Sequence, residues 1–158
     1  MKPATVAQLK KELKFRSSDE LEELCLRLAK FKKENKELLT YLLFQSHDEE
    51  AYIESVKQVI DDGFSTINTN SYYYMKKTVR KVLRMVKKYI RYSKKKETEV
   101  ELLLYFCEQL KNIKPSIKKN KTLTNLYERQ LTLVKKRITE LHEDLQHDYT
   151  LEIEELNL

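Results

Sequence analysis

Hydrophobic residues recur every three or four positions along most of this chain, which is the spacing of one face of an α-helix. The clearest series follows Ser17 and Glu20, whose spacing is that of a capping box at the start of a helix. The series predicts one long second helix, and we expect its single polar member, Asn35, to make a polar contact with a neighbouring helix, with a ligand contact as the alternative. Its members are Leu21, Leu24, Leu28, Phe31, Asn35, Leu38 and Leu42.

Further segments follow the same period and predict the remaining helices. A short first helix is expected over residues 5–15. Asp48 can cap a third helix, and the only glycine, Gly63, suits the end of that helix. The later helices are assigned by their start signals: Thr69, Asn70 or Ser71 for a fourth, Thr98 for a fifth that stops before Pro115, and Thr122 for a last long helix.

No segment shows the alternation of a strand or the turn dipeptide of a hairpin. We therefore predict an all-α fold of five or six helices, arranged as an antiparallel bundle or as a short stack of αα-hairpins. The length fits one domain over residues 1–158, with a short N-terminal helix within 1–16 and an acidic, frayed tail at 150–158. Heptad-like spacing also permits a coiled-coil dimer, although short connections favour pairing within the chain.

Composition supports the helical prediction and bears on the environment of the protein. One Gly and two Pro leave little from which to build turns. The N-terminus lacks the apolar stretch of a signal peptide, and the longest nearly apolar runs, 38–44 and 102–107, are too short to span a bilayer. Cys25 and Cys107 lack metal-ligand spacing, so we interpret both as reduced, mostly buried thiols. These features predict a soluble, cytoplasmic protein.

The distribution of charge is the most informative feature of the sequence. Residues 72–96 contain eleven Lys or Arg and no Asp or Glu, whereas the rest of the chain carries 20 cations and 25 acids. The net charge of +6 therefore resides in this one segment. On a helix its apolar residues form one sector, and most of its cations form another, which we call the basic wall. The basic wall consists of Lys76, Lys77, Arg80, Lys81, Arg84, Lys87, Lys88 and Arg91.

An anionic partner is expected for such a surface, and three kinds are compatible with the sequence. The first is the phosphate backbone of DNA or RNA, because a helix of about 30 Å can follow several phosphates and the planar fork of Arg suits them. Two further groups of residues would assist: a shoulder that could stack on bases (Tyr74, Thr78, Met85 and Tyr92), and lysines around Pro115 (Lys111, Lys114, Lys118, Lys119 and Lys121).

The second kind of partner is an acidic protein surface. The chain itself provides candidates, since residues 138–158 hold seven acids and no Lys or Arg, and residues 48–62 hold six acids and one Lys. Those segments could neutralise the basic wall within the fold or in a self-associated form. An anionic membrane surface is the third and weakest candidate, because the apolar sector offers no Trp or Phe for insertion.

Signals for catalysis are poor. One glycine cannot form the Gly-rich loops that hold phosphates. Asp144 and His147 have the carboxylate-x-x-His spacing of metal sites in bundles, but such a site needs two pairs. We therefore predict a non-enzymatic domain, without cofactor or metal, that binds the nucleic-acid backbone through residues 72–96. The alternative is a structural or protein-interaction module whose basic helix pairs with acidic helices.

Overall fold

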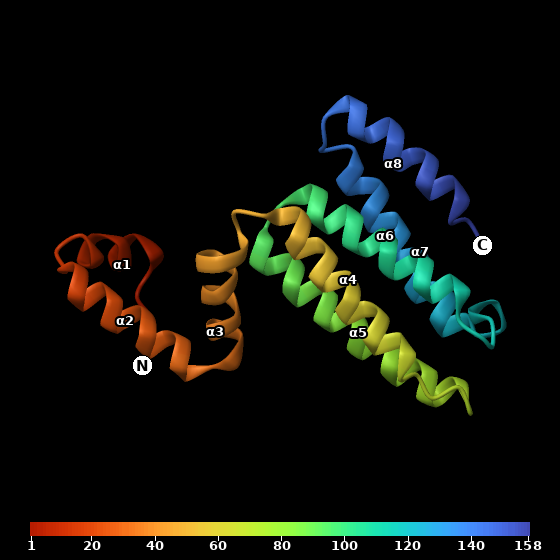
Figure 1. Cartoon of the computed structure of the whole chain (residues 1–158), viewed down its shortest axis with the longest axis horizontal. Coiled ribbons are helices and arrows are strands. Elements are labelled where there is room, and N and C mark those ends of the chain that lie inside the picture. The colour runs from red at the N-terminus through yellow and green to blue at the C-terminus, as the bar shows by residue number, and fades with distance from the viewer. The chain divides into compact units, whose positions relative to one another are not determined.

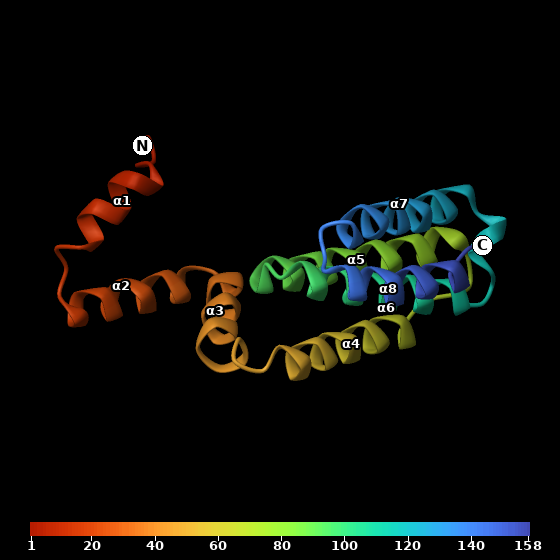
Figure 2. The ribbon, with the colours of Figure 1, turned by 90° about the horizontal axis from the view of Figure 1, so that it is seen from above.

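The computed structural model describes all residues from 1 to 158, and its regular secondary structure is entirely helical. The predicted all-α fold is confirmed, but the predicted count of five or six helices is wrong, because two of the predicted helices are each divided in two (Figures 1 and 2). The elements are α1 (Val6–Leu13), α2 (Ser18–Phe31), α3 (Lys33–Thr40), a π-helical turn η1 (Tyr41–Gln45), α4 (Glu49–Ser65), α5 (Tyr72–Ser93), α6 (Lys96–Asn112), a 3-10 turn η2 (Ile117–Lys119), α7 (Lys121–Ile138) and α8 (Glu143–Glu155).

The chain forms two compact units, Met1–Phe44 and Gln45–Leu158, which we call unit 1 and unit 2. The assignment of the whole chain to one domain stays a prediction. Helices α1, α2 and α3 of unit 1 bury only Ala29 among their residues. Unit 2 holds the hydrophobic core described below.

The predicted long second helix is interrupted at Lys32, which has extended backbone angles (φ −141°, ψ 145°). The side-chain Nδ2 of Asn35 donates a hydrogen bond of 2.8 Å to the carbonyl oxygen of Leu28. In an uninterrupted helix that carbonyl would accept the N–H of Lys32 instead. Asn35 thus makes a polar contact, but its partner lies within the segment predicted as the same helix rather than in a neighbouring one. The contact takes the place of a helical hydrogen bond at the break.

The predicted last long helix is interrupted between α7 and α8. The His142 side chain accepts a hydrogen bond from the N–H of Asp144 at 3.3 Å and so caps α8. On the other side of the break, the Gln146 side chain donates to the carbonyl of Leu141 at 2.7 Å. Polar side chains therefore satisfy the backbone groups that the interruption exposes. Within the predicted acidic tail, α8 continues to Glu155, and Ile153 and Leu156 are buried.

Helices α4 to α8 of unit 2 run alternately up and down, and α6 packs against α4, α5 and α7 (Figure 1). Because α6 has neighbours on several sides, its apolar residues cover most of its circumference rather than one stripe. The centre of the core consists of residues that are almost inaccessible to solvent: Ile60, Met75, Val79, Val82, Val86, Val100, Leu102, Leu103, Phe106, Cys107, Leu110, Ile117, Leu123, Tyr127 and Val134.

Local start signals were predicted with mixed success. The Ser17–Glu20 capping box is present, and the Asp48 and Ser71 side chains accept backbone N–H groups at the starts of α4 and α5. The predicted start of α6 at Thr98 is wrong, because α6 begins at Lys96 and the Thr98 hydroxyl, buried inside it, donates to a carboxylate oxygen of Glu49 at 2.7 Å. The predicted Thr122 cap of α7 is also wrong, because Asn120 caps that helix.

Gly63 lies inside α4 rather than at its end, because the helix continues to Ser65. A Cβ atom at this position would lie 2.6 Å from Cγ2 of Val82 in α5. The glycine therefore permits the close approach of α4 and α5, rather than a turn. This approach helps to fix the helix that carries the basic wall.

Candidate anion-binding face

The basic wall lies on the side of α5 that faces away from the core. Met75, Val79, Val82 and Val86 are buried on the opposite side, where α5 packs against α4 and α6. Of the cations in the wall, Lys77, Arg80, Lys81, Arg84 and Arg91 are exposed, and Lys76, Lys87 and Lys88 are half-buried. The helical spacing in the sequence thus places all eight residues along one helix, with their charged ends toward its outer side.

Most of the wall is not neutralised within the chain. Seven of its cations form no ion pair: Lys76, Lys77, Arg80, Lys81, Arg84, Lys87 and Arg91. Lys88 lies with its Nζ 4.8 Å from the centroid of the Tyr89 ring. The acids of unit 2 pair with other cations, such as Lys57 with Glu101 at 2.8 Å and Lys96 with Glu140 at 2.9 Å.

The acidic helix α8 packs on α7 and does not cover the wall. Figure 1 shows α6 and α7 between α8 and α5. The end of α8 is held by Tyr127, whose hydroxyl donates to the carbonyl of Leu156, and by Lys111, whose Nζ donates to the carbonyl of Glu155 at 2.7 Å. The acids of α8, one of the two acidic segments that the sequence offers as internal partners of the wall, are therefore on another side of unit 2. In the other segment, Glu49 pairs with Lys95, which follows α5 and is not part of the wall, at 3.1 Å.

The five lysines around Pro115 divide into two groups. Lys111 is engaged with the C-terminal carbonyls of α8 and so does not extend the basic wall. The segment around Pro115 is tied to the start of α5, because the Tyr72 hydroxyl donates to the carbonyl of Ser116 at 2.8 Å. The remaining lysines of this cluster, Lys114, Lys118, Lys119 and Lys121, are exposed in or next to that segment. The sequence contained no signal for the Tyr72–Ser116 contact, since 44 positions separate the two residues.

The aromatic surface beside the wall differs from the predicted shoulder. Tyr92 is buried and Tyr74 is exposed, so only Tyr74 offers an accessible ring of the two. Tyr73, which the predicted shoulder did not include, is 59% exposed and packs edge-on against Tyr74, with centroids 5.4 Å apart. Lys77 Nζ lies 4.6 Å from the centroid of Tyr73. The exposed rings are therefore gathered at the N-terminal end of α5, next to cations.

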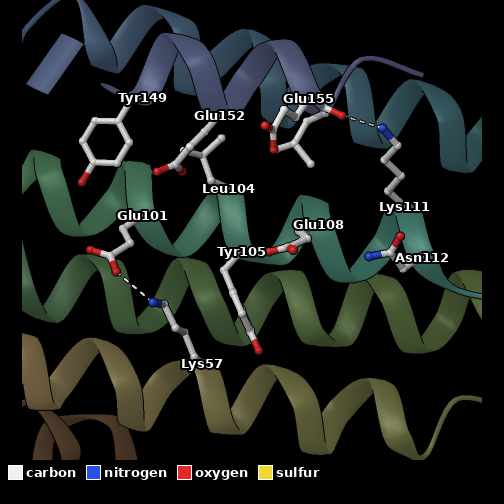
Figure 3. Close-up of a pocket in the computed structure, with 11 residues that line it drawn as sticks. Lys57, Glu101, Leu104, Tyr105, Glu108, Lys111, Asn112, Tyr149, Glu152 and Glu155 are labelled. Atoms are coloured by element: carbon white, nitrogen blue, oxygen red, sulfur yellow. Dashed lines mark hydrogen bonds and ion pairs between the residues drawn. The ribbon is translucent and has the colours of Figure 1, made fainter. Parts of the chain in front are cut away.

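A groove of about 620 Å³ opens between α4, α6 and α8 and has the opposite character (Figure 3). Glu101, Glu108 and Glu152 line it, and Lys57 reaches across from α4 to Glu101. Burial, together with the charges of Glu101 and Glu108, raises the pKa of Glu152. The remaining lining residues are Leu104, Tyr105, Lys111, Asn112, Tyr149, Glu155 and Leu156. No pattern in the sequence indicates this groove, because the groove depends on how α8 docks.

Two predictions about reactive groups can be compared with the structure. Cys107 is buried as expected, and burial raises the pKa of its thiol to about 12. The expectation for Cys25 is wrong, because this thiol is exposed on α2, a helix with almost no buried surface. No three or more side chains of His, Cys, Asp or Glu are grouped so that they could hold a metal ion.

None of the helices combines the length and apolar character needed to cross a bilayer. Comparisons with models of protein families, with curated proteins and with solved structures find no match for this chain. The basis for a functional assignment is therefore the chemistry of the exposed residues.

Proposed function

We propose that the chain binds the phosphate backbone of nucleic acids through the basic wall of α5, as a non-enzymatic binding domain. The observation that carries this proposal is the row of cations without carboxylate partners on one side of a helix whose other side is buried. Like charges on neighbouring turns of a helix repel one another, and a polyanion would relieve that repulsion. Arg80, Arg84 and Arg91 add planar donors that suit phosphate oxygens.

The dimensions of α5 support a contact along a strand. Its 22 residues correspond to about 33 Å of helix, which can follow roughly six phosphates. Because α4 and α6 cover the back of α5, the helix presents one face and would lie against the backbone rather than enter a groove. Such contacts position a protein on nucleic acid without reading its sequence. We therefore assign the wall to sequence-tolerant binding of DNA or RNA.

The proposal is tested by fluorescence anisotropy of the full chain with short labelled duplexes and single strands of DNA and RNA. Contacts to about six phosphates would make log affinity fall with log salt at a slope near −5 for duplex DNA. Absence of binding by the natural chain at the lowest salt concentration would reject the proposal and favour an acidic protein surface as the partner.

A matched pair of variants locates the binding face. R80E/R84E/R91E reverses three cations of the wall, and R129E/K135E/K136E reverses three exposed cations of α7. Both variants change the net charge equally, so a contribution from overall charge affects them alike. We expect roughly 100-fold or greater weakening for the wall variant, with a salt slope smaller by about 3, and a much smaller effect for the α7 variant. Equal weakening would show that the wall is not the binding face.

A further inference from the structure

Unit 1 carries a row of large apolar side chains that the chain leaves accessible to solvent. On α2, Leu24 is 41% exposed, Leu28 is 62% exposed and Phe31 is 77% exposed. Helices α1 to α3 bury only one residue, and isolated helices of this length are marginal in water. A unit of this size with so small a core is expected to gain stability from an association that covers the row.

The apolar row has the pattern of a coiled-coil seam. Its positions alternate steps of three and four, as the a and d positions of heptads do. Counting Leu21 as position a places Leu28 and Asn35 also at a, so one amide occurs among apolar residues. A single Asn at an a position fixes the register and the number of helices in a coiled coil. We call the following residues the seam: Leu21, Leu24, Leu28, Phe31, Asn35 and Leu38.

We propose that the seam pairs with the seam of a second copy of this chain, parallel and in register. In that arrangement each residue meets its own counterpart, so apolar residues meet apolar residues and the Asn35 amides meet each other. A helix without an amide at this level would leave Asn35 buried and unpaired, which disfavours an unrelated partner. The acids in the first turns of α2, Asp19, Glu20, Glu22 and Glu23, disfavour insertion into an anionic membrane.

The dimer requires α2 and α3 to run as one helix, and the sequence allows this. No Gly or Pro occurs from residue 18 to residue 40, and α3 begins without a side-chain cap. When Lys32 becomes helical, its N–H takes over the Leu28 carbonyl, which Asn35 occupies in the single chain. The Asn35 amide is then released to its counterpart. Asn35 thus has a hydrogen-bond partner in both states, within the chain before association and across the seam after it.

The variant K33P separates the two states. Proline is tolerated at the first position of a helix, which Lys33 occupies in α3, and it holds the preceding residue in the extended conformation that Lys32 already has. In a continuous helix the same proline would clash with the carbonyl of Ala29. K33P therefore preserves the interrupted form and prevents the continuous one. K33A removes the same side chain, including its contact with Glu37, and serves as the matched control.

Sedimentation equilibrium of the full chain over a wide concentration range tests the proposal. We expect the natural chain and K33A to dimerise, with helical circular dichroism rising as the dimer forms, and K33P to remain monomeric. A natural chain that stays monomeric at every concentration would overturn the proposal, and so would a K33P dimer as stable as that of K33A. These outcomes do not depend on nucleic-acid binding.

Two further variants test the register. N35L is expected to associate more tightly but to lose a single oligomeric state, because the amide that selects it is gone. A general apolar patch would show no such loss, and an N35L chain that stays strictly dimeric would contradict the assigned role. In a C25S background, the two copies of the L21C variant should cross-link to each other on oxidation. In a parallel dimer, position 21 of one copy lies next to position 21 of the other. A dimer that fails to cross-link would overturn the parallel register, because an antiparallel seam puts these residues at opposite ends.

Discussion

Charged residues on two faces of unit 2 differ in whether they form ion pairs. On the outer side of α5, seven cations lie along the basic wall without a carboxylate partner. At the groove between α4, α6 and α8, Lys57 pairs with Glu54 and Glu101, each at 2.8 Å, and Glu108, Glu152 and Glu155 also line the groove. The ion pair between Lys57 and Glu101 at the groove thus joins α4 to α6, whereas these seven cations of the wall form no ion pair with another helix. Cations that form no ion pair within the chain are available to bind an external anion.

The largest expected effect concerns the side of α5 that packs against α4. This packing positions both the basic wall on α5 and the α4 side of the groove. In G63V the added side chain would collide with Val82, and we expect the free energy of unfolding to fall by about 3 kcal/mol in urea denaturation. Adding V82A makes room, so the double variant should recover part of the loss. Unchanged stability of G63V would contradict the close approach of α4 and α5.

A direct comparison of the two faces comes from single charge reversals. K57E places a carboxylate beside Glu101 and Glu54, and the Lys57 side chain is only 20% exposed, so we expect a loss of about 2 kcal/mol. R84E removes an exposed cation from a repulsive row and should change stability by less than about 0.5 kcal/mol. K57M controls for the loss of the pair without a new acid. Equal losses for K57E and R84E, measured by urea denaturation, would refute the contrast.

The smallest expected effect is a dependence of the free energy of unfolding on pH, caused by Glu152 in the groove. The pKa of Glu152 is raised in the folded chain by burial, then by Glu101 and Glu108. The stability linked to its protonated form is complete below the unfolded pKa of about 4.3 and is lost as the pH rises through the folded pKa. E152Q should therefore be more stable than the natural chain at pH 7 by a few tenths of a kcal/mol, with no such advantage below about pH 4.

Urea denaturation at both pH values measures this difference. E154Q removes an acid from the same helix that does not line the groove, and it controls for the loss of one negative charge. An E152Q chain less stable than the natural one at pH 7 would mean that Glu152 makes a favourable contact when ionised.

The features that the sequence predicted well are those with local causes. Ser17, Asp48 and Ser71 start helices because a side-chain oxygen meets backbone N–H groups three positions away. The sectors of α5 follow from helical period alone, which is why the wall and the buried valines are on the expected sides.

The features that sequence could not predict arise from a local choice between two hydrogen-bond donors and from contacts between distant segments. The break at Lys32 depends on whether the Leu28 carbonyl accepts the Asn35 side chain or the N–H of Lys32, and either donor satisfies the carbonyl. The groove depends on the docking of α8, and the link from Tyr72 to Ser116 joins the loop to α5 across the fold. Periodicity describes one helix at a time and therefore contains no information about such contacts.

The two cysteines give each unit its own chemical reporter. Cys25 is exposed in unit 1, whereas Cys107 is fully buried in α6, the helix with most neighbours in unit 2. A thiol reagent should therefore modify Cys25 at once and Cys107 only when unit 2 opens. The rate of the slow reaction then measures the opening of unit 2, while the fast one follows the accessibility of α2. The natural sequence, without any substitution, thus allows the stability of unit 2 to be measured separately from the exposure of α2 in unit 1.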